Sequence, residues 1–238
     1  LLCVFTIDGG TEVGCYRSVD AGVNWASRAS PVEATQDIWW LQPGNYADNQ
    51  DADLLFWDVS ANELSLKVYD NSADSWAETL VAASMIEAMP GIAGPQLAAS
   101  VRASDGHLIV VAWNAYDAVG ADLKCWDING AGSITAKTNV VTDSDDSILA
   151  GLFIDQATND LSVFYVGKSD GSETVGTNTN LYRKVSTDGG TTWGAETLVE
   201  DATFNGNLKS LSVALGGGSG ALAVPVTMRI DSGLRHAI

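Results

Sequence analysis

The sequence predicts an all-β fold, a β-propeller built from four-stranded antiparallel blades. Three observations predict it: a unit of alternating strands recurs along the 238 residues, a polar turn that ends in Trp recurs inside that unit, and helical periodicity is almost absent. Repeats of about 40 to 60 residues with four short strands are typical of propellers, whose radial packing leaves only short strand edges. We expect a single domain over residues 1–238, with about five blades or as a piece of a six-bladed propeller.

The repeated unit is visible when three blocks of the sequence are laid side by side. They are LLCVFTIDGGTEVGCYRSVDAGVNW (1–25), LLFWDVSANELSLKVYDNSADSW (54–76), and LSVFYVG with LYRKVSTDGGTTW inside 161–193. The pentapeptide AETLV follows the Trp of the last two blocks, at 77–81 and 195–199. A weaker middle unit spans 96–138, and strands at 209–215 and 221–228 begin a last one.

The turn that ends in Trp has the spacing S-x-D-x-G-x-x-W in two copies. This pattern resembles the Asp box, or bacterial neuraminidase repeat, and the chain resembles the Asp-box β-propellers of the sialidase-like superfamily. A third, altered copy has Tyr69, Asn71 and Ala73 at the Ser, Asp and Gly positions. The resemblance implies that the boxes lie between the third and fourth strands of a blade, at its periphery. The box residues are Ser18, Asp20, Gly22, Trp25, Trp76, Ser186, Asp188, Gly190 and Trp193.

Each member of this turn has a structural task. A hydroxyl and a carboxylate two residues apart accept hydrogen bonds from the backbone N–H groups of the turn. Glycine permits positive φ where the chain reverses, and the Trp covers the turn with a large apolar face. We therefore interpret Asp20 and Asp188 as turn-forming residues and not as catalytic carboxylates.

The chain is strongly acidic, with 30 Asp and Glu against 12 Lys and Arg and a formal charge of −18. This charge argues against nucleic acid as a partner, because a polyanion is repelled. It is either a solubility feature or a surface that collects cations. The acidic runs 48–53 and 142–147 make Ca²⁺ a weak candidate, since neither has the full spacing of a Ca²⁺ loop, and no other cofactor is expected.

No apolar run approaches the roughly 18 residues that a membrane-spanning helix needs, so no membrane insertion is expected. The cysteines Cys3, Cys15 and Cys125 lack CxxC spacing, which argues against a zinc site. A Cys3–Cys15 disulfide across a predicted hairpin is an open alternative. The sequence opens in a strand already in progress, without a leader pattern, so we expect a mature or excised piece. We separately expect a secreted or extracytoplasmic location.

The architecture implies that ligands bind where loops join the second strand of a blade to the third, and one blade to the next. Long segments of this kind are 82–95, 114–122, 167–180 and 200–207. Aromatic rings beside carboxylates and amides suit a sugar, since rings stack on C–H faces and polar groups bind hydroxyls. The candidate ligand-binding residues are Trp113, Tyr116, Asp117 and Phe204, with Asp170 and Glu173 in the 167–180 loop.

A catalytic set is harder to assign. The resemblance implies three arginines that clamp a substrate carboxylate, a Tyr–Glu pair and an acid/base Asp, and bidentate pairing explains why arginine is needed. Three of the six arginines flank the boxes, which leaves Arg102, Arg229 and Arg235 as weak candidates. The Arg-Ile-Pro motif is absent, and the sequence assigns no Tyr–Glu pair. His107 lies in a predicted tight turn and supports no Ser-His-Asp arrangement.

The sequence thus indicates a glycan or glycoconjugate as the partner and leaves the enzyme question open. The first hypothesis is an extracellular carbohydrate-binding propeller without catalysis. The second is a glycoside hydrolase, a relative of exo-sialidases that removes terminal sugars. The third is a structural or attachment module of a surface or viral protein.

Overall fold

The computed structural model describes residues 2–7, 12–31, 38–43, 52–58, 61–85, 97–114, 122–142, 148–170, 172–173, 180–200, 208–213, 226–230 and 233–237. These residues form strands and turns, so the predicted all-β class is confirmed. In this described part no helix is long and apolar enough to cross a bilayer. The chain divides into two compact units, Leu1–Ile86 and Glu87–Ile238. The prediction of one domain over 1–238 stays a prediction.

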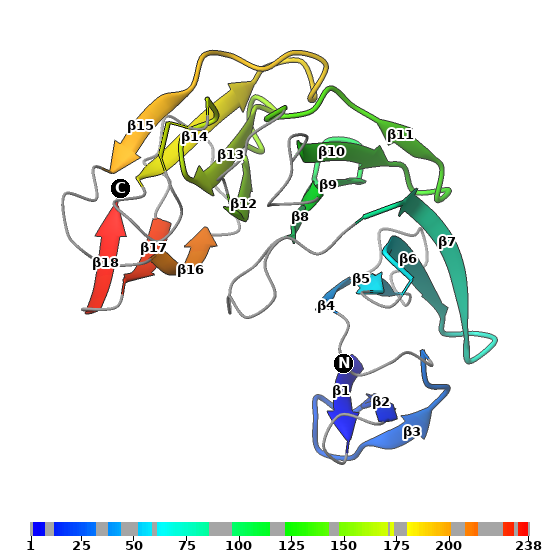
Figure 1. Cartoon of the computed structure of the whole chain (residues 1–238). Coiled ribbons are helices and arrows are strands. Elements are labelled where there is room, and N and C mark those ends of the chain that lie inside the picture. Colours follow the sequence, from blue (N-terminus) through cyan, green and yellow to red (C-terminus); the bar gives the residue numbers. More distant parts are fainter. Residues whose placement is uncertain are drawn as a thin grey trace. The chain divides into compact units, whose positions relative to one another are not determined.

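Unit 1 contains two antiparallel sheets, in which each strand pairs with the next one in the chain (Figure 1). The first has the order β1-β2-β3 and the second the order β4-β5-β6-β7. The strands are β1 (Leu2–Ile7), β2 (Glu12–Arg17), β3 (Ala26–Arg28), β4 (Ile38–Pro43), β5 (Ala52–Asp58), β6 (Glu63–Asp70) and β7 (Ser75–Ala83).

Unit 2 contains three further sheets with the same up-and-down connection. Their orders are β11-β10-β9-β8, β12-β13-β14-β15 and β16-β17-β18, so three of the five described sheets have the expected four strands. The strands are β8 (Leu97–Arg102), β9 (His107–Asn114), β10 (Asp122–Ile128), β11 (Ile134–Ala136), β12 (Ile148–Ile154), β13 (Leu161–Val166), β14 (Leu181–Ser186), β15 (Thr197–Glu200), β16 (Leu208–Val213), β17 (Val226–Ile230) and β18 (Gly233–Ala237).

The sheets of unit 2 pack through their first strands. Strand β12 contacts β8 and β9 on one side and β16 on the other. Gly151 of β12 lies directly against Val213 of β16, and a side chain at position 151 would collide with it. The second strands β9 and β13 are apolar along nearly their whole length because the sheet is covered on both faces. This apolar core places Trp113 edge-on to Tyr165, with 6.2 Å between ring centroids.

The two full box turns share the hydrogen bonds of their Ser hydroxyl and Asp carboxylate to the backbone. Ser186 Oγ accepts from Gly190 N (2.8 Å) and donates to Asp188 Oδ1 (2.8 Å), and Asp188 accepts from Thr192 N (2.8 Å) and Thr192 Oγ1 (2.6 Å). Bonds from Thr192 and Ser186 lower the pKa of Asp188 to about 2. Glycines 189 and 190 have φ of 68° and 86°, values that L side chains rarely adopt. The carboxylate thus stays charged and bonded inside the turn.

The first box turn, in the β1-β2-β3 sheet, repeats the geometry of the Ser and Asp side chains. Ser18 Oγ accepts from Gly22 N at 2.8 Å, and Asp20 Oδ1 accepts from Asn24 N at 2.8 Å. Bonds from the backbone and side chain of Asn24, and then from Ser18, lower the pKa of Asp20 to about 2.

In the altered third turn, the hydrogen-bond acceptors are not the residues at the Ser and Asp positions of the pattern. Asp70 Oδ1 accepts from Ser72 N (2.7 Å) and Ala73 N (3.0 Å), and Asp74 Oδ1 accepts from the Tyr69 hydroxyl (2.9 Å). The carboxylates at positions 70 and 74 therefore supply turn acceptors in a copy that lacks the Ser and Asp of the pattern.

Two of the turns hold the chain that leaves the preceding sheet. Trp76 Nε1 donates to the carbonyl of Ala29, one residue after β3, at 2.8 Å. Trp193 Nε1 donates to the carbonyl of Thr138, two residues after β11, at 2.9 Å. A lysine makes the matching bond two residues further along the leaving segment: Lys67 Nζ donates to Pro31 O, and Lys184 Nζ donates to Val140 O at 2.9 Å. We call this pair of bonds the Lys–Trp contact.

The backbone register of the β1–β2 hairpin bears on the Cys3–Cys15 disulfide that the sequence left open. The register pairs Val4 with Cys15 and Cys3 with Tyr16, so the hairpin does not set the two cysteines opposite one another. Cys15 and Cys125 are both buried. The register therefore argues against the Cys3–Cys15 disulfide.

Candidate ligand-binding site

The candidate site lies where β13 ends and β14 begins, at the base of the predicted 167–180 loop. The described part of this loop is 167–170, 172–173 and 180. Gly167 N donates to Asn180 O at 3.0 Å, which closes the base, and Gly167 has φ of 90°, in the region that favours glycine. Tyr165 and Tyr182 are directly opposite each other across the strand pair, so both rings lie on the same face of the sheet.

The first polar group of the site is built on Glu173. Its Oε1 accepts from the Tyr182 hydroxyl (2.5 Å) and from Asn180 Nδ2 (2.7 Å), and its Oε2 accepts from Asn180 N (3.0 Å). Burial, and then the bond to Glu173, raise the pKa of Tyr182 to about 12. The phenol is therefore protonated at neutral pH and acts as a hydrogen-bond donor.

The second polar group is built on Glu196, which precedes β15. Glu196 Oε2 accepts from the Tyr165 hydroxyl at 2.6 Å and from Ser169 N at 2.9 Å. Burial, and then the bond to Glu196, raise the pKa of Tyr165 far above its ordinary value. The rings of Tyr165 and Tyr182 stack at 6.4 Å with an interplanar angle of 27°. The two carboxylates thus fasten the two ends of the loop to one tyrosine pair.

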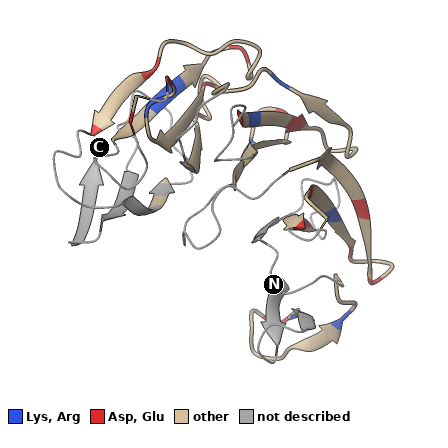
Figure 2. Ribbon diagram, in the orientation of Figure 1, with Lys and Arg blue, Asp and Glu red and all other residues tan. Residues whose placement is uncertain are grey.

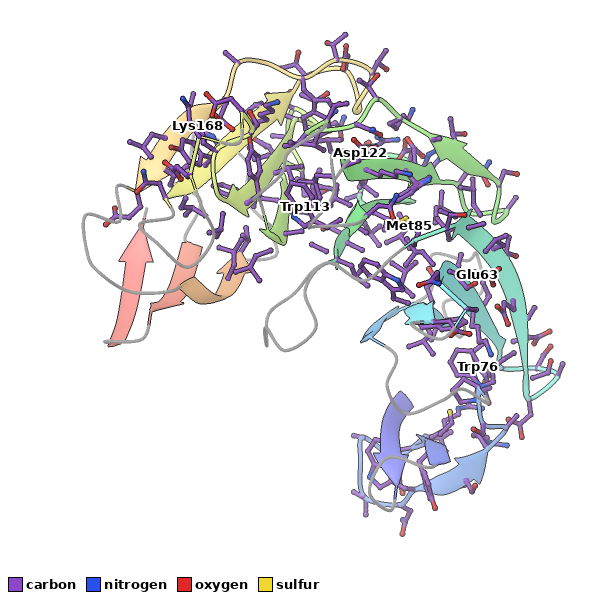
Figure 3. The ribbon with its side chains drawn as sticks, in the orientation of Figure 1. Glu63, Trp76, Met85, Trp113, Asp122 and Lys168 are labelled. Carbon is purple, nitrogen blue, oxygen red and sulfur yellow. The ribbon has the colours of Figure 1, made fainter. Side chains whose placement is uncertain are left out.

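Cations at the site are already engaged. Lys168 Nζ lies 2.6 Å from Asp170 Oδ2, and Lys168 is labelled in Figure 3 at the β13–β14 end. The bond to Asp170 raises the pKa of Lys168, and the bond from Lys168 lowers that of Asp170 to about 2. Figure 2 shows a basic band on β14, which is made by Arg183 and Lys184. Burial lowers the pKa of Lys184, whose ammonium is bound in the Lys–Trp contact.

This arrangement suits recognition of hydroxyl groups. Carboxylate, amide and phenol oxygens accept hydrogen bonds, and amide N–H groups donate them, which are the two functions that a polyol needs from its site. Both phenols have raised pKa values, so neither is primed to act as a nucleophile at neutral pH. Among the described residues, no three His, Cys, Asp or Glu side chains gather as a metal site.

Trp113 does not belong to a ligand face, contrary to the sequence prediction. Its side chain is fully buried, and its indole Nε1 donates to the carbonyl of Leu149 at 2.7 Å. Leu149 has φ of 59° and lies in a bulge at the start of β12, which turns its carbonyl toward the indole. Trp57 makes the equivalent bond in unit 1, to the carbonyl of Met85 at 2.9 Å. Trp113 is thus a core residue.

Arg102 lies at the turn between β8 and β9. It ends β8 at the turn to β9, opposite His107, while Asn114 at the other end of β9 leads into the 115–121 loop. Its Nη2 lies 2.6 Å from Asp105 Oδ2 and 3.1 Å from Asp127 Oδ2. These two carboxylates occupy the guanidinium, so the prediction of Arg102 as a substrate clamp is not supported by its position.

Other predicted residues lie outside the described part of the structure. Tyr116, Asp117 and Phe204 are among them, as are residues 48–51 and 143–147 of the two acidic runs. Arg229 and Arg235 belong to β17 and β18, where only the backbone is described. The register pairs Arg229 with Leu234 and Arg235 with Met228, so the two are not cross-strand partners. Their predicted roles stay predictions.

The sequence interpretation found Asp170 and Glu173 but assigned no Tyr–Glu pair. The structure has two such pairs, and both tyrosines flank the 167–180 segment, one of the four long loops that the sequence indicated. One signal pointed to Glu196: it repeats Glu78 in the second AETLV copy, and Glu78 lies 3.6 Å from Lys67 of the Lys–Trp contact.

No protein-family model and no curated protein sequence matches the chain. Solved structures do. An α-L-arabinofuranosidase from Fusarium graminearum, in complex with an iminosugar inhibitor, superposes with a TM-score of 0.58 at 11% identity over 96% of this chain and 70% of its own. The chain has a sialidase-like β-propeller fold.

Two more structures show the same fold. The GH93 α-L-arabinofuranosidase of F. graminearum with arabinobiose has a TM-score of 0.51 at 13% identity, over 84% of this chain. The NanB sialidase from Streptococcus pneumoniae has a TM-score of 0.50 at 10% identity, over 94% of this chain. This sialidase-like propeller spans 65% of the length of the first and 34% of the second.

Proposed function

We propose that this sialidase-like propeller is a secreted or extracytoplasmic protein that recognises glycans through the β13–β14 end of its unit 2. The observation that carries the proposal is the meeting of Glu173, Asn180 and Tyr182 at the base of one loop. The structures with the same fold include complexes with an iminosugar inhibitor and with arabinobiose, and this supports a sugar as the ligand.

The chemistry of these three residues supports binding of sugar hydroxyls. Glu173 keeps lone pairs beyond the three bonds that it accepts within the protein, and it is half-buried, so its oxygens stay within reach of a ligand. The bonds from Asn180 and Tyr182 hold the carboxylate in one orientation. A pre-oriented acceptor binds a hydroxyl without the entropic cost of ordering a free side chain.

A glycoside hydrolase is the second candidate, and the two Tyr–Glu bonds are the observation that favours it. The raised pKa values of both phenols weigh against it, because a phenolate nucleophile needs a lowered value. We therefore place recognition without hydrolysis first. Release of a fluorophore from a sialoside or an α-L-arabinofuranoside by the purified protein would reverse this order.

The test is binding of the purified chain to a broad glycan array, with Tyr182→Phe beside the wild type. The substitution removes one hydroxyl and leaves the Glu173 carboxylate without that donor, so we expect affinity to fall by about tenfold. Tyr69→Phe is the matched control, because Tyr69 makes the same kind of bond, to Asp74 at 2.9 Å, in unit 1.

Three outcomes separate the hypotheses. Selective glycan binding that Tyr182→Phe weakens and Tyr69→Phe leaves unchanged supports the proposal. If both variants retain glycan binding, the binding site lies elsewhere than at this loop. Absence of any glycan binding refutes the proposal and favours the attachment module, whose partner is a protein.

A further inference from the structure

The charged side chains around the β13–β14 loop bear on the class of glycan. The segment from β13 to the end of β14 contains three cations, Lys168, Arg183 and Lys184. An acidic sugar needs a cation that is able to pair with its carboxylate. The present partners of these three residues therefore decide whether such a sugar is accepted.

Lys168 is the cation of the loop itself, and it is bound to a carboxylate of the same loop. Its Nζ lies 2.6 Å from Asp170 Oδ2, and both side chains are partly exposed, at 41% and 54%. Glu196 and Glu173 also attract this ammonium and add to the rise in its pKa. The Lys168 ammonium is thus paired with Asp170 before any ligand arrives.

The two cations of β14 are bound elsewhere or directed away from the loop. Lys184 donates to Val140 O at 2.9 Å, in the Lys–Trp contact. Arg183 is directly opposite Phe164, and alternation along the strand places it on the other face from Tyr182 and its hydrogen-bonded Glu173. Neither side chain is placed to pair with a ligand carboxylate at the loop.

We propose that the glycan bound at this loop is uncharged, and that Asp170 determines this selectivity by holding the Lys168 ammonium. The inference rests on the proposed function, because it concerns the ligand of the same site. An incoming carboxylate meets Glu173 and Glu196, and the three cations described between β13 and the end of β14 are all bound or directed elsewhere, whereas the hydroxyls of a neutral sugar meet acceptors and donors. Like charges brought together across an interface lower affinity.

The test compares neutral oligosaccharides with their carboxylate-bearing counterparts, lactose and 3′-sialyllactose among them, by calorimetric titration of the full chain. We expect the wild type to bind the neutral member at least about tenfold more tightly. Asp170→Asn releases Lys168, so the preference should shrink several-fold. Raising the salt concentration should shrink it as well, because salt screens exposed charges.

Asp160→Asn is the control, because it removes the same charge from the opposite end of β13. It should leave the preference unchanged. Lys168→Ala should also retain the preference for the neutral sugar, since it removes the cation that Asp170→Asn releases.

Equal or tighter wild-type binding of the acidic member would overturn the inference while the proposed function stands. An unchanged ratio in Asp170→Asn would overturn the role of Asp170 in the same way. Failure of the wild type to bind any sugar would refute the proposed function itself, and with it this inference.

Discussion

Replacing Ser186 by alanine should destabilise unit 2 through one buried turn. Ser186 is 1% exposed, and its Oγ accepts from Gly190 N at 2.8 Å and from Asp188 N at 3.4 Å. Alanine removes this acceptor, and the buried Gly190 N–H is left without it.

The size of the effect follows from that orphaned donor. A buried N–H without a partner costs about 1 to 3 kcal/mol, and the bond at 3.4 Å adds little because it is near the limit of hydrogen-bond distance. We therefore expect the free energy of unfolding to fall by about 1 to 3 kcal/mol. Ser18→Ala should cost less, because the equivalent Gly22 N–H is only partly buried.

Equilibrium urea unfolding followed by Trp fluorescence and circular dichroism measures both variants. Thr187→Ala is the control, since Thr187 is an exposed neighbour in the same turn, and we expect a change within about 0.5 kcal/mol. A Ser186→Ala variant as stable as the control would refute the reasoning. So would a larger cost for Ser18→Ala than for Ser186→Ala.

Three further predictions concern single side chains. The pKa of Asp188 is about 2 in the folded state, below its ordinary 3.8, so its contribution to stability is present above about pH 4 and is lost as pH falls toward 2; Asp188→Asn should lack this part of the acid dependence in unfolding titrations. Trp113→Phe removes the donor to Leu149 O and leaves a cavity, so we expect a loss of about 2 to 4 kcal/mol in urea unfolding, and a loss below 1 kcal/mol would contradict its core position. Burial raises the pKa of Cys125 to about 12, so its thiol should react with a disulfide reagent only after unfolding, and rapid reaction of the native protein would contradict the burial.

The sequence predicted what depends on local spacing. The alternation of apolar and polar residues predicted the strands. The S-x-D-x-G-x-x-W spacing located the turns whose hydrogen bonds the structure shows at Ser18 and Ser186. These features can be predicted from the sequence because a turn and its neighbouring strands involve residues that are close in sequence. The all-β propeller fold could be predicted for the same reason, since it is the repetition of one such unit.

The candidate site could be predicted only in part, because it depends on contacts between distant residues. Glu196 accepts a hydrogen bond from Tyr165, which lies 31 positions earlier in the sequence, and no sequence spacing predicts that bond. Trp113 stands in an apolar strand that leads into a loop, and only the position of the Leu149 carbonyl shows that its indole faces the core. Arg102 was only a weak candidate for a substrate clamp, and its bonds to Asp105 and Asp127 are visible only in the structure, since Asp127 lies 25 positions away.

The Lys–Trp contact has a consequence for the order in which the chain acquires its structure. In both copies the groups that hold a leaving segment belong to the next sheet, 36 and 47 positions later in unit 1, and 44 and 55 positions later in unit 2. During synthesis, a completed sheet therefore stays unfastened at its outer end until the third strand and turn of its successor have emerged. Within each unit, cooperativity then passes between the two sheets that the contact joins, as between the neighbours of a repeat protein.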